Sequence, residues 1–429
     1  MRILFLGGYG LVGSAALARL AAAGHDIVGL TRSRQVLRLP RVEWRYGDLA
    51  RMILPEDWRS WIEGIDAVVN CAGALEEGTR DTLENVHVKG PDALYRACVE
   101  AGVRRIVHVS AAGIEGIDTA FARTKRESEA RLRALDLDWI ILRPGLVLAE
   151  AAYGGTGLMR GLAGLPFFTP LSNANCVVQT VSVKDVAETI AVALEGNARL
   201  RATFELVHPA TTTLSDIARA YRAWLCFPPC PILRVPNFVI GALAFLGDAA
   251  AHLGWRNPLR RATMRHLAHG VVGSPEAWIE ATGIKPRSLN EFLAEVPSTV
   301  QERRFARLYF VKPLGIVVLS LFWITSGVIA LGPSAESAHA AFLRAGIDGE
   351  LARLVVAAGA LLDIAIGLAI GLRRTARAAL GLSVLVSFGY LAAATILRPD
   401  LWGDPLGTLV KIFPVAFAAI AVAALMDER

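Results

Sequence analysis

Three glycines near the N-terminus form the motif that most clearly predicts chemistry. Gly7, Gly10 and Gly13 follow the apolar run Ile3–Leu6 and open the alanine-rich run Ser14–Ala23, so they lie where a strand gives way to a helix. Gly7 can turn sharply, Gly10 lets the backbone approach a pyrophosphate, and Gly13 allows close packing of helix on sheet. The first helical amides then face the phosphates. The motif predicts a dinucleotide site that also includes Tyr9, Leu11 and Val12.

The end of the next predicted strand, Asp26–Thr31, carries arginines where an acid is usual. A site for NAD(H) commonly has Asp or Glu here, which binds the 2′-hydroxyl of the adenosine ribose. Arg32 and Arg34 can instead pair with a 2′-phosphate, which favours NADP(H) over NAD(H). The alternative is that both arginines lie in a solvated loop.

Further strands must carry polar residues to the same edge of the sheet. Short apolar runs predict four of them, at Val42–Tyr46, Asp66–Asn70, Arg105–Ser110 and Trp139–Leu142. Open parallel sheets bind ligands at the carboxyl ends of their strands, so Ser110 is a candidate site residue. The predicted fold class is α/β. A parallel sheet with helices on both faces occupies residues 1–150, and a smaller substrate-side lobe occupies 151–300.

The first 150 residues resemble the short-chain dehydrogenase/reductase superfamily, in its extended (epimerase/dehydratase) and atypical (NmrA-like) branches. The matching segments are Gly7-x-x-Gly10-x-x-Gly13, Gly47-Asp48-Leu49, Asn70-Cys71-Ala72-Gly73, Asn85 before Val88-Lys89-Gly90, His108-Val109-Ser110, Lys125 and Arg143-Pro144-Gly145. The resemblance implies a Rossmann-type sheet in which Ser110 orients a substrate carbonyl and Lys125 holds the nicotinamide ribose. It also implies a catalytic role for Asn85, an adenosine site flanked by Asp48, Leu49, Cys71, Ala72 and Gly73, and a nicotinamide site edged by Pro144 and Gly145.

One departure from the superfamily concerns its proton donor, the tyrosine of a Tyr-x-x-x-Lys motif. Here the motif reads Phe121-Ala-Arg-Thr-Lys125, and phenylalanine carries no proton. Lys125 can still hold the ribose, so we expect nucleotide binding without the usual general acid. Tyr153 lies in the segment that usually lines the substrate side and is a candidate substitute, although a plain loop tyrosine is the simpler reading.

The last third of the chain has the composition of a membrane unit. After a basic linker at 301–312, four apolar segments approach the roughly 20 residues needed to cross a bilayer: Pro313–Leu331, Leu351–Leu372, Ala378–Leu397 and Leu406–Leu425. The basic residues gather before the first segment and between the second and third. The positive-inside rule then places the N-terminal domain and both termini in the cytoplasm. The fusion of a reductase-like domain to the membrane unit 313–429 resembles an arrangement of bacterial inner-membrane proteins.

The membrane unit resembles the DoxX-like family of four-helix proteins, which is loosely linked to quinone and thiol redox systems. Asp363 falls near the middle of the second segment, where a charge costs about 2.5 to 3.5 kcal/mol, so it predicts a proton or quinone contact or a helix-packing hydrogen bond. Lys411 lies near one end of the fourth segment and can snorkel outward. An apolar stretch at Ile232–Leu246 is too short to span and is expected to lie at a surface touching lipid or in a core.

Composition excludes several other functions. The chain has 429 residues, 54% hydrophobic content and a formal net charge of +6 without a basic stripe, which gives no indication of nucleic-acid binding. Its five cysteines have no zinc spacing, so no metal site is predicted and the thiols are expected to be reduced.

The sequence is compatible with three functions. The first is an NADP(H)-dependent reductase acting on a quinone or lipid-linked compound. The second is a non-catalytic nucleotide-bound protein that stabilises or senses a membrane redox complex, like the accessory subunit of complex I. The third is a sugar-nucleotide epimerase or dehydratase, which depends most on the missing phenol.

Overall fold

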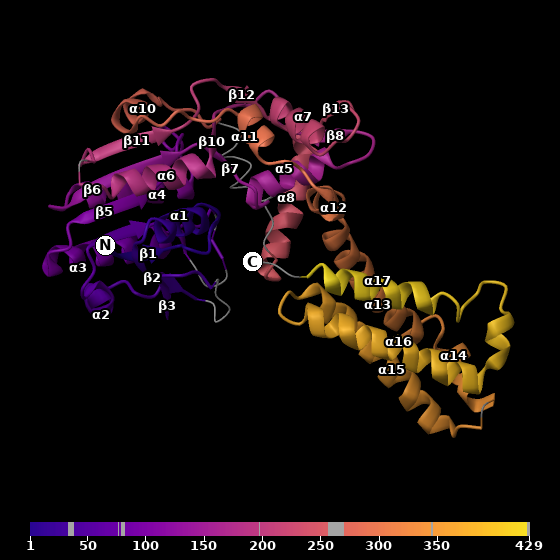
Figure 1. Cartoon of the computed structure of the whole chain (residues 1–429). Coiled ribbons are helices and arrows are strands. Elements are labelled where there is room, and N and C mark those ends of the chain that lie inside the picture. Colours follow the sequence, from indigo (N-terminus) through magenta and orange to yellow (C-terminus); the bar gives the residue numbers. More distant parts are fainter. Residues whose placement is uncertain are drawn as a thin grey trace. The chain divides into compact units, whose positions relative to one another are not determined.

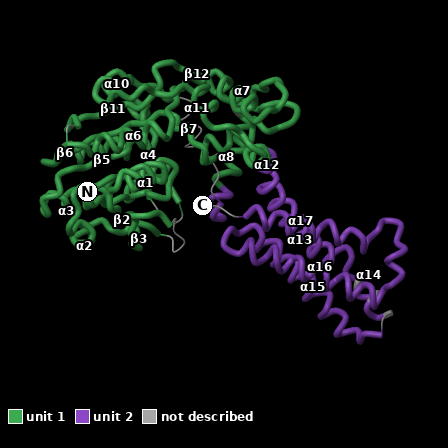
Figure 2. The backbone as a smooth tube through the Cα atoms, in the orientation of Figure 1, with its two compact units in different colours: residues 1–248, 257–306 green, residues 249–256, 307–429 purple. Residues whose placement is uncertain are grey.

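The computed structural model divides the chain into two compact units (Figure 2). Unit 1 comprises Met1–Asp248 and Asn257–Ala306, and unit 2 comprises Ala249–Arg256 and Arg307–Arg429. The structure describes residues 1–32, 38–75, 77–78, 82–196, 198–255, 270–344 and 346–426. Each unit is considered by itself.

Unit 1 is built on a seven-stranded parallel sheet (Figure 1) with the order β11-β6-β5-β4-β1-β2-β3. Its strands are β1 (Arg2–Leu6), β2 (Asp26–Thr31), β3 (Val42–Tyr46), β4 (Ala67–Asn70), β5 (Arg105–Val109), β6 (Asp138–Pro144) and β11 (Ala202–Leu206). The order reverses between β1 and β4, and such a switch point is where doubly wound sheets bind ligands. The predicted α/β fold class is confirmed.

Both faces of the sheet are covered, which explains the continuous apolar runs of its central strands. Ile3 and Phe5 of β1 point into one core, while Leu4 and Leu6 point into the other. Helices α1 (Leu11–Ala22) and α6 (Val183–Ala193) cover the first face. The second face packs against α2 (Arg59–Ile62), α3 (Gly90–Ala101) and α4 (Ala120–Arg133). The chain is helical throughout 83–101, with a π-helical stretch at Asn85–Lys89 that leads directly into α3.

A smaller lobe with its own core follows β6. Its elements are β7 (Leu146–Leu148), α5 (Gly154–Ala163), β8 (Thr169–Leu171), β9 (Val177–Val178), β10 (Thr180–Ser182), β12 (Thr212–Thr213), α7 (Leu214–Trp224), β13 (Ile232–Arg234), α8 (Asn237–His252), α10 (Glu276–Thr282), α11 (Leu289–Glu295) and α12 (Val300–Leu308). Ser182, not Asp185 as expected from the sequence, caps α6 by accepting a bond from the amide of Lys184. Asp185 is buried and pairs with Arg287.

Among its described residues, unit 2 contains three helices long and apolar enough to cross a membrane, within Val300–Leu331, Gly349–Gly371 and Ala376–Leu397. Its elements are α13 (Val311–Leu331), α14 (Ala335–Arg344), α15 (Gly349–Gly371), α16 (Ala376–Leu397) and α17 (Ile412–Ala424). The fourth predicted segment is shorter than expected, since α17 has 13 residues. Pro414 restricts the residue before it and cannot donate a helical bond, so the helix begins close to it. Lys411 is the exposed N-cap of α17 and lies outside the helix proper.

Glycines bring α13 and α15 unusually close together. A side-chain carbon on Gly327 would lie 2.4 Å from the carbonyl oxygen of Ala360, and one on Gly367 would lie 2.7 Å from that of Ser320. Small residues at such crossings let two helical backbones approach and hydrogen-bond across the interface. The Ser320 hydroxyl does so, donating to the carbonyl of Gly367 at 2.7 Å.

Candidate functional site

The glycine motif forms a tight loop between β1 and α1. Gly7 has φ +76°, and a side-chain carbon there would lie 2.6 Å from the amide nitrogen of Ala72. At Gly13 the same carbon would lie 2.0 Å from the carbonyl oxygen of Gly7. Gly10 is the N-cap of α1 and supplies no capping side chain, so the amides of the first turn, which starts at Leu11 and Val12, can face an anion. This geometry fits a pyrophosphate.

The outer end of the same loop carries the residues predicted to contact adenosine. The Tyr9 ring packs 5.1 Å, centroid to centroid, from that of Trp44. Arg32 is exposed after β2, with its Nη1 3.9 Å from Oδ1 of Asp48. Arg34 falls outside the described residues.

Asn85 does not join the predicted catalytic residues. Its side-chain amide donates to the carbonyl of Ala50 at 3.1 Å, which fixes the turn after Asp48. The buried Leu49 belongs to the same turn, and a side-chain carbon on Gly90 would lie 2.4 Å from its carbonyl oxygen. Asn85 therefore positions the adenosine end of the site.

Ser110 and Lys125 lie together at the carboxyl ends of β4 and β5. Lys125 is buried and donates from Nζ to the carbonyl of Val109 at 3.0 Å. The same nitrogen lies 3.3 Å from the point where Gly73 would carry a side chain. The Ser110 hydroxyl is buried and has no hydrogen-bond partner among the described residues. An unpaired buried hydroxyl at this edge fits a ligand that supplies the missing partner.

Ser110, Lys125, Cys71 and Gly73 form the strand-end cluster, and burial sets the protonation states of its titratable side chains. It lowers the pKa of Lys125 to about 8, against the opposing charge of Glu129. Burial also raises the pKa of the Cys71 thiol to about 12, although the nearby Lys125 opposes it. Cys71 is therefore a neutral thiol rather than a nucleophilic thiolate.

A histidine that sequence reasoning missed supports the motif that lost its tyrosine. His87 Nε2 accepts a bond from the amide of Ala74 at 3.0 Å, so the proton resides on Nδ1, which lies 2.8 Å from Oγ1 of Thr124. Burial, with the charge of Lys125, lowers the pKa of His87 to about 2. Phe121 meets this neutral ring edge-on, 5.6 Å between centroids. Neither ring can supply a proton, so Phe121 leaves the site without its usual acid.

A second buried network, made of hydrogen bonds, stabilises the turn after β4. The Asn70 side chain donates to the Tyr95 hydroxyl at 2.9 Å and accepts from the amide of Ala72 at 3.0 Å. Tyr95 in turn lies 2.8 Å from Nδ1 of His108. Sequence reasoning identified Asn70 only by family resemblance, because the pairing joins residues far apart in the chain.

The nicotinamide edge predicted at Pro144–Gly145 is anchored by a buried ion pair. Arg143 forms a bidentate pair with the buried Glu129, at 2.9 and 2.6 Å. Gly145 lies where a side-chain carbon would come within 2.6 Å of the carbonyl oxygen of Gln179. Tyr153 is half exposed at the start of α5, and its phenol makes no hydrogen bond with any described residue of the strand-end cluster.

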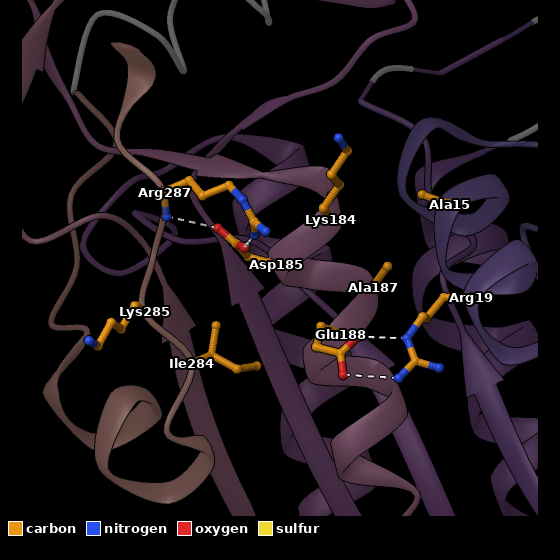
Figure 3. Close-up of a pocket in the computed structure, with 9 residues that line it drawn as sticks. All are labelled: Ala15, Arg19, Lys184, Asp185, Ala187, Glu188, Ile284, Lys285 and Arg287. Carbon is orange, nitrogen blue, oxygen red and sulfur yellow. Dashed lines mark hydrogen bonds and ion pairs between the residues drawn. The ribbon is translucent and has the colours of Figure 1, made fainter. Parts of the chain in front are cut away.

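A polar surface pocket of about 560 Å³ lies elsewhere on unit 1, between α1, α6 and the segment 284–287 (Figure 3). Arg19 and Glu188, which line it, form an ion pair at 2.6 Å, and Asp185 pairs with Arg287. None of the predicted site residues lines it. The described residues contain no cluster of metal-ligating side chains.

Unit 2 has one buried carboxyl group in its helical interior. Asp363 of α15 accepts bonds from the Ser326 hydroxyl of α13 at 2.9 Å and from the Tyr390 hydroxyl of α16 at 2.7 Å. The carboxyl group therefore links three helices, as expected for a packing hydrogen bond.

Two family models match the chain, one for each unit. A model described as NAD(P)H-binding matches residues 7–197, and one for the DoxX-like family matches residues 320–420. The glycine loop and the strand-end cluster both lie in the first match.

Curated relatives have several functions. An epimerase family protein of Mycobacterium leprae is 24% identical over 280 residues, which cover 59% of this chain and 87% of that protein. The mitochondrial NADH-ubiquinone oxidoreductase 40 kDa subunit of Neurospora crassa is 24% identical over 71% of this chain and 84% of that subunit. A 2-alkyl-3-oxoalkanoate reductase of Stenotrophomonas maltophilia is 29% identical, but the match covers only 34% of this chain and 51% of that enzyme.

Solved structures share the fold of unit 1. UDP-glucose 4-epimerase of Thermotoga maritima with UDP-glucose has a TM-score of 0.53 at 17% identity, over 72% of this chain and 100% of the other. The dTDP-glucose 4,6-dehydratase of Bacillus anthracis in complex with NAD has a TM-score of 0.54 at 15% identity, over 71% and 96%. The chain therefore combines a Rossmann-fold domain that matches the NAD(P)H-binding family model with a C-terminal region that matches the DoxX-like family.

Proposed function

We propose that the protein is a membrane-anchored, NADP(H)-dependent oxidoreductase that reduces a hydrophobic carbonyl compound or quinone. The observation that carries this proposal is the unpaired, buried hydroxyl of Ser110 beside Lys125. A purely structural Rossmann domain gains nothing from a desolvated hydroxyl without a partner, whereas a substrate carbonyl would accept its hydrogen bond.

Each site residue then has a defined task. The glycine loop and the first turn of α1 bind the pyrophosphate, and Lys125 donates its remaining N–H groups to the ribose. Bound NADPH supplies a hydride, and Ser110 orients the carbonyl that receives it. Because Phe121 offers no proton, the proton that completes the reduction comes from water. Quinones suit such a site, since the reduced oxygen of a quinone is less basic than an alkoxide.

The preference for NADP(H) rests on Arg32. No acidic residue follows β2 to bind a 2′-hydroxyl, and the Arg32 guanidinium lies exposed in that position. Replacing Arg32 with Asp should weaken NADPH binding roughly 10- to 100-fold and leave NADH binding almost unchanged. Equal losses for both nucleotides would contradict the preference.

The bilayer orientation is also part of the proposal. Basic residues lie at one end of the spanning helices, at Arg303, Arg304, Arg307 and Lys312 and again at Arg373, Arg374 and Arg377. The positive-inside rule places these ends and the nucleotide domain in the cytoplasm of a bacterium. If α17 makes a fourth crossing, the C-terminus returns to that side. Cysteine labelling in vesicles of opposite orientation tests this topology.

A second function is favoured by a specific observation, the replacement of the tyrosine by Phe121. A nucleotide-bound domain that only stabilises a membrane redox complex would need no general acid. The similarity to the 40 kDa subunit of NADH-ubiquinone oxidoreductase agrees with this alternative. A sugar-nucleotide epimerase or dehydratase is less well supported, because those reactions depend on the phenol.

One experiment separates these functions. The full chain is purified in nanodiscs, its bound nucleotide is identified by mass spectrometry, and NADPH oxidation is followed with short-chain quinones for the wild type and Phe121→Tyr. Turnover by the wild type supports the reductase. Tightly bound nucleotide without turnover by either protein supports the structural role. Turnover only by Phe121→Tyr would show a reductase site from which the acid has been removed.

A further inference from the structure

An apolar helix that begins in unit 1 is covered by described residues along one face only. Helix α8 (Asn237–His252) contains Asp248 and ends in His252, and its other residues after Asn237 are apolar or small. Ala244 and Gly247 are buried and Ile240 and Ala251 are half-buried, whereas Phe238, Leu243 and Leu246 are exposed. A helix with apolar residues on both faces normally lies in a protein core or in a membrane. Because the described residues cover only one face, another apolar phase must cover the exposed one.

The exposed face of this helix carries large apolar side chains. Phe238, in the first turn of α8, is 78% exposed, and Leu246 is 61% exposed. The apolar patch consists of Phe238, Leu243 and Leu246. Contiguous exposed apolar patches mark interaction surfaces with proteins or membranes.

The other end of α8 identifies which surface this is. Just after the helix, Trp255 donates to the carbonyl of Gly371 at 2.7 Å, and the amide of Arg373 donates to the carbonyl of Leu253 at 3.1 Å. Gly371 and Arg373 form the turn between α15 and α16, two helices long enough to span a bilayer. A turn between two spanning helices that carries arginines lies at the headgroups.

We infer that the apolar patch and α8 lie in the interfacial region of the lipid bilayer and attach the nucleotide domain to the membrane surface. The helix is about 24 Å long and begins, at its docked end, at headgroup level. Lying in the interface buries its leucines and phenylalanines, whereas projecting into water would expose them all.

Depth measurements on the full chain test this inference without any need for turnover. A nitroxide is attached to Phe238→Cys, Leu243→Cys or Leu246→Cys in a Cys226→Ser background, in nanodiscs of phosphatidylcholine and phosphatidylglycerol. Val99→Cys is the matched control, because Val99 is an exposed apolar residue on a helix of unit 1. The signal of the labelled parent protein is subtracted.

The expected result is a ratio of oxygen to nickel-chelate accessibility severalfold higher at the three patch positions than at Val99→Cys. Ratios equal to the control would overturn the inference, since the patch would then face water. Low accessibility to both reagents would also overturn it, because protein, such as a second copy of the chain, would cover the patch. Loss of nucleotide binding would leave the outcome of this test unchanged and would instead count against the proposed function.

Discussion

The strand-end cluster of unit 1 and the helical interior of unit 2 both bury polar side chains, but they satisfy them differently. In unit 1 the Ser110 hydroxyl is buried without a partner among the described residues, and Lys125 donates one N–H group to a backbone carbonyl. In unit 2 both oxygens of Asp363 accept bonds from neighbouring helices. Beside a glycine loop that fits a pyrophosphate, an unpaired buried hydroxyl leaves room for a hydrogen bond from a ligand, whereas the satisfied carboxyl group of Asp363 serves helix packing.

The strongest test of the ligand side is Gly13→Val. Any side chain at this position would collide with the carbonyl oxygen of Gly7, 2.0 Å from the first added carbon. The loop would have to move away from α1, so we expect nucleotide affinity to fall by at least roughly 1,000-fold, or about 4 kcal/mol. Gly155→Ala is the control, because nothing lies within 4 Å of the added carbon there. Calorimetric titration with NADPH measures both variants, and unaltered affinity in Gly13→Val would refute the placement of the pyrophosphate.

Ser110→Ala tests whether the unpaired hydroxyl serves a substrate. Turnover should fall roughly 100-fold, because the hydrogen bond to the reacting carbonyl is lost. The thermal stability of the nucleotide-free protein should not fall, since no described protein group loses a partner. A lower melting temperature would show that the hydroxyl has a structural role, and the contrast with Asp363 would then disappear.

The pKa of Lys125 predicts a pH dependence of nucleotide binding. In the free protein this pKa is about 8, and phosphate and ribose oxygens placed beside the ammonium group would raise it in the complex. Affinity should therefore be constant below about pH 8 and fall above it, by up to about tenfold per pH unit. Lys125→Met should bind NADPH more weakly and lose this slope. A slope that persists in Lys125→Met would assign it to another group.

The smallest effect is expected in unit 2, where Asp363 makes packing bonds. Asp363→Leu leaves the hydroxyls of Ser326 and Tyr390 without their acceptor and should cost about 1 to 2 kcal/mol of stability. Asp363→Asn keeps a carbonyl acceptor and should cost less. Melting of the full chain in detergent compares the two. If Asp363→Asn instead retains its stability but abolishes quinone turnover, Asp363 transfers protons, and helix packing alone does not explain its role.

The elements of both units could be predicted because each follows from a local pattern. Ile3–Leu6 and its glycines specify a strand, a turn and a helix from neighbouring residues alone. The long apolar segments of unit 2 likewise follow from their length, although Pro414 shortened the last one. Neither pattern depends on what lies across the fold.

The residues that surround the site could not be predicted in this way. His87 contacts Thr124, and Glu129 pairs with Arg143. These contacts form only because β4, β5 and β6 pair in their observed register and α4 packs against them. Asn85, expected in the catalytic group from family resemblance, donates to the carbonyl of Ala50, a contact between residues far apart in the chain.

The amino-acid sequence by itself determined the glycine loop, the loss of the phenol at Phe121 and the apolar lengths of unit 2, since each depends on residue type and spacing along the chain. Tertiary structure alone decided that the Ser110 hydroxyl has no partner among the described residues, that Asp363 is satisfied and that one face of α8 stays exposed. Burial and hydrogen bonding depend on partners distant in sequence, and only the folded chain brings those partners together or leaves them apart.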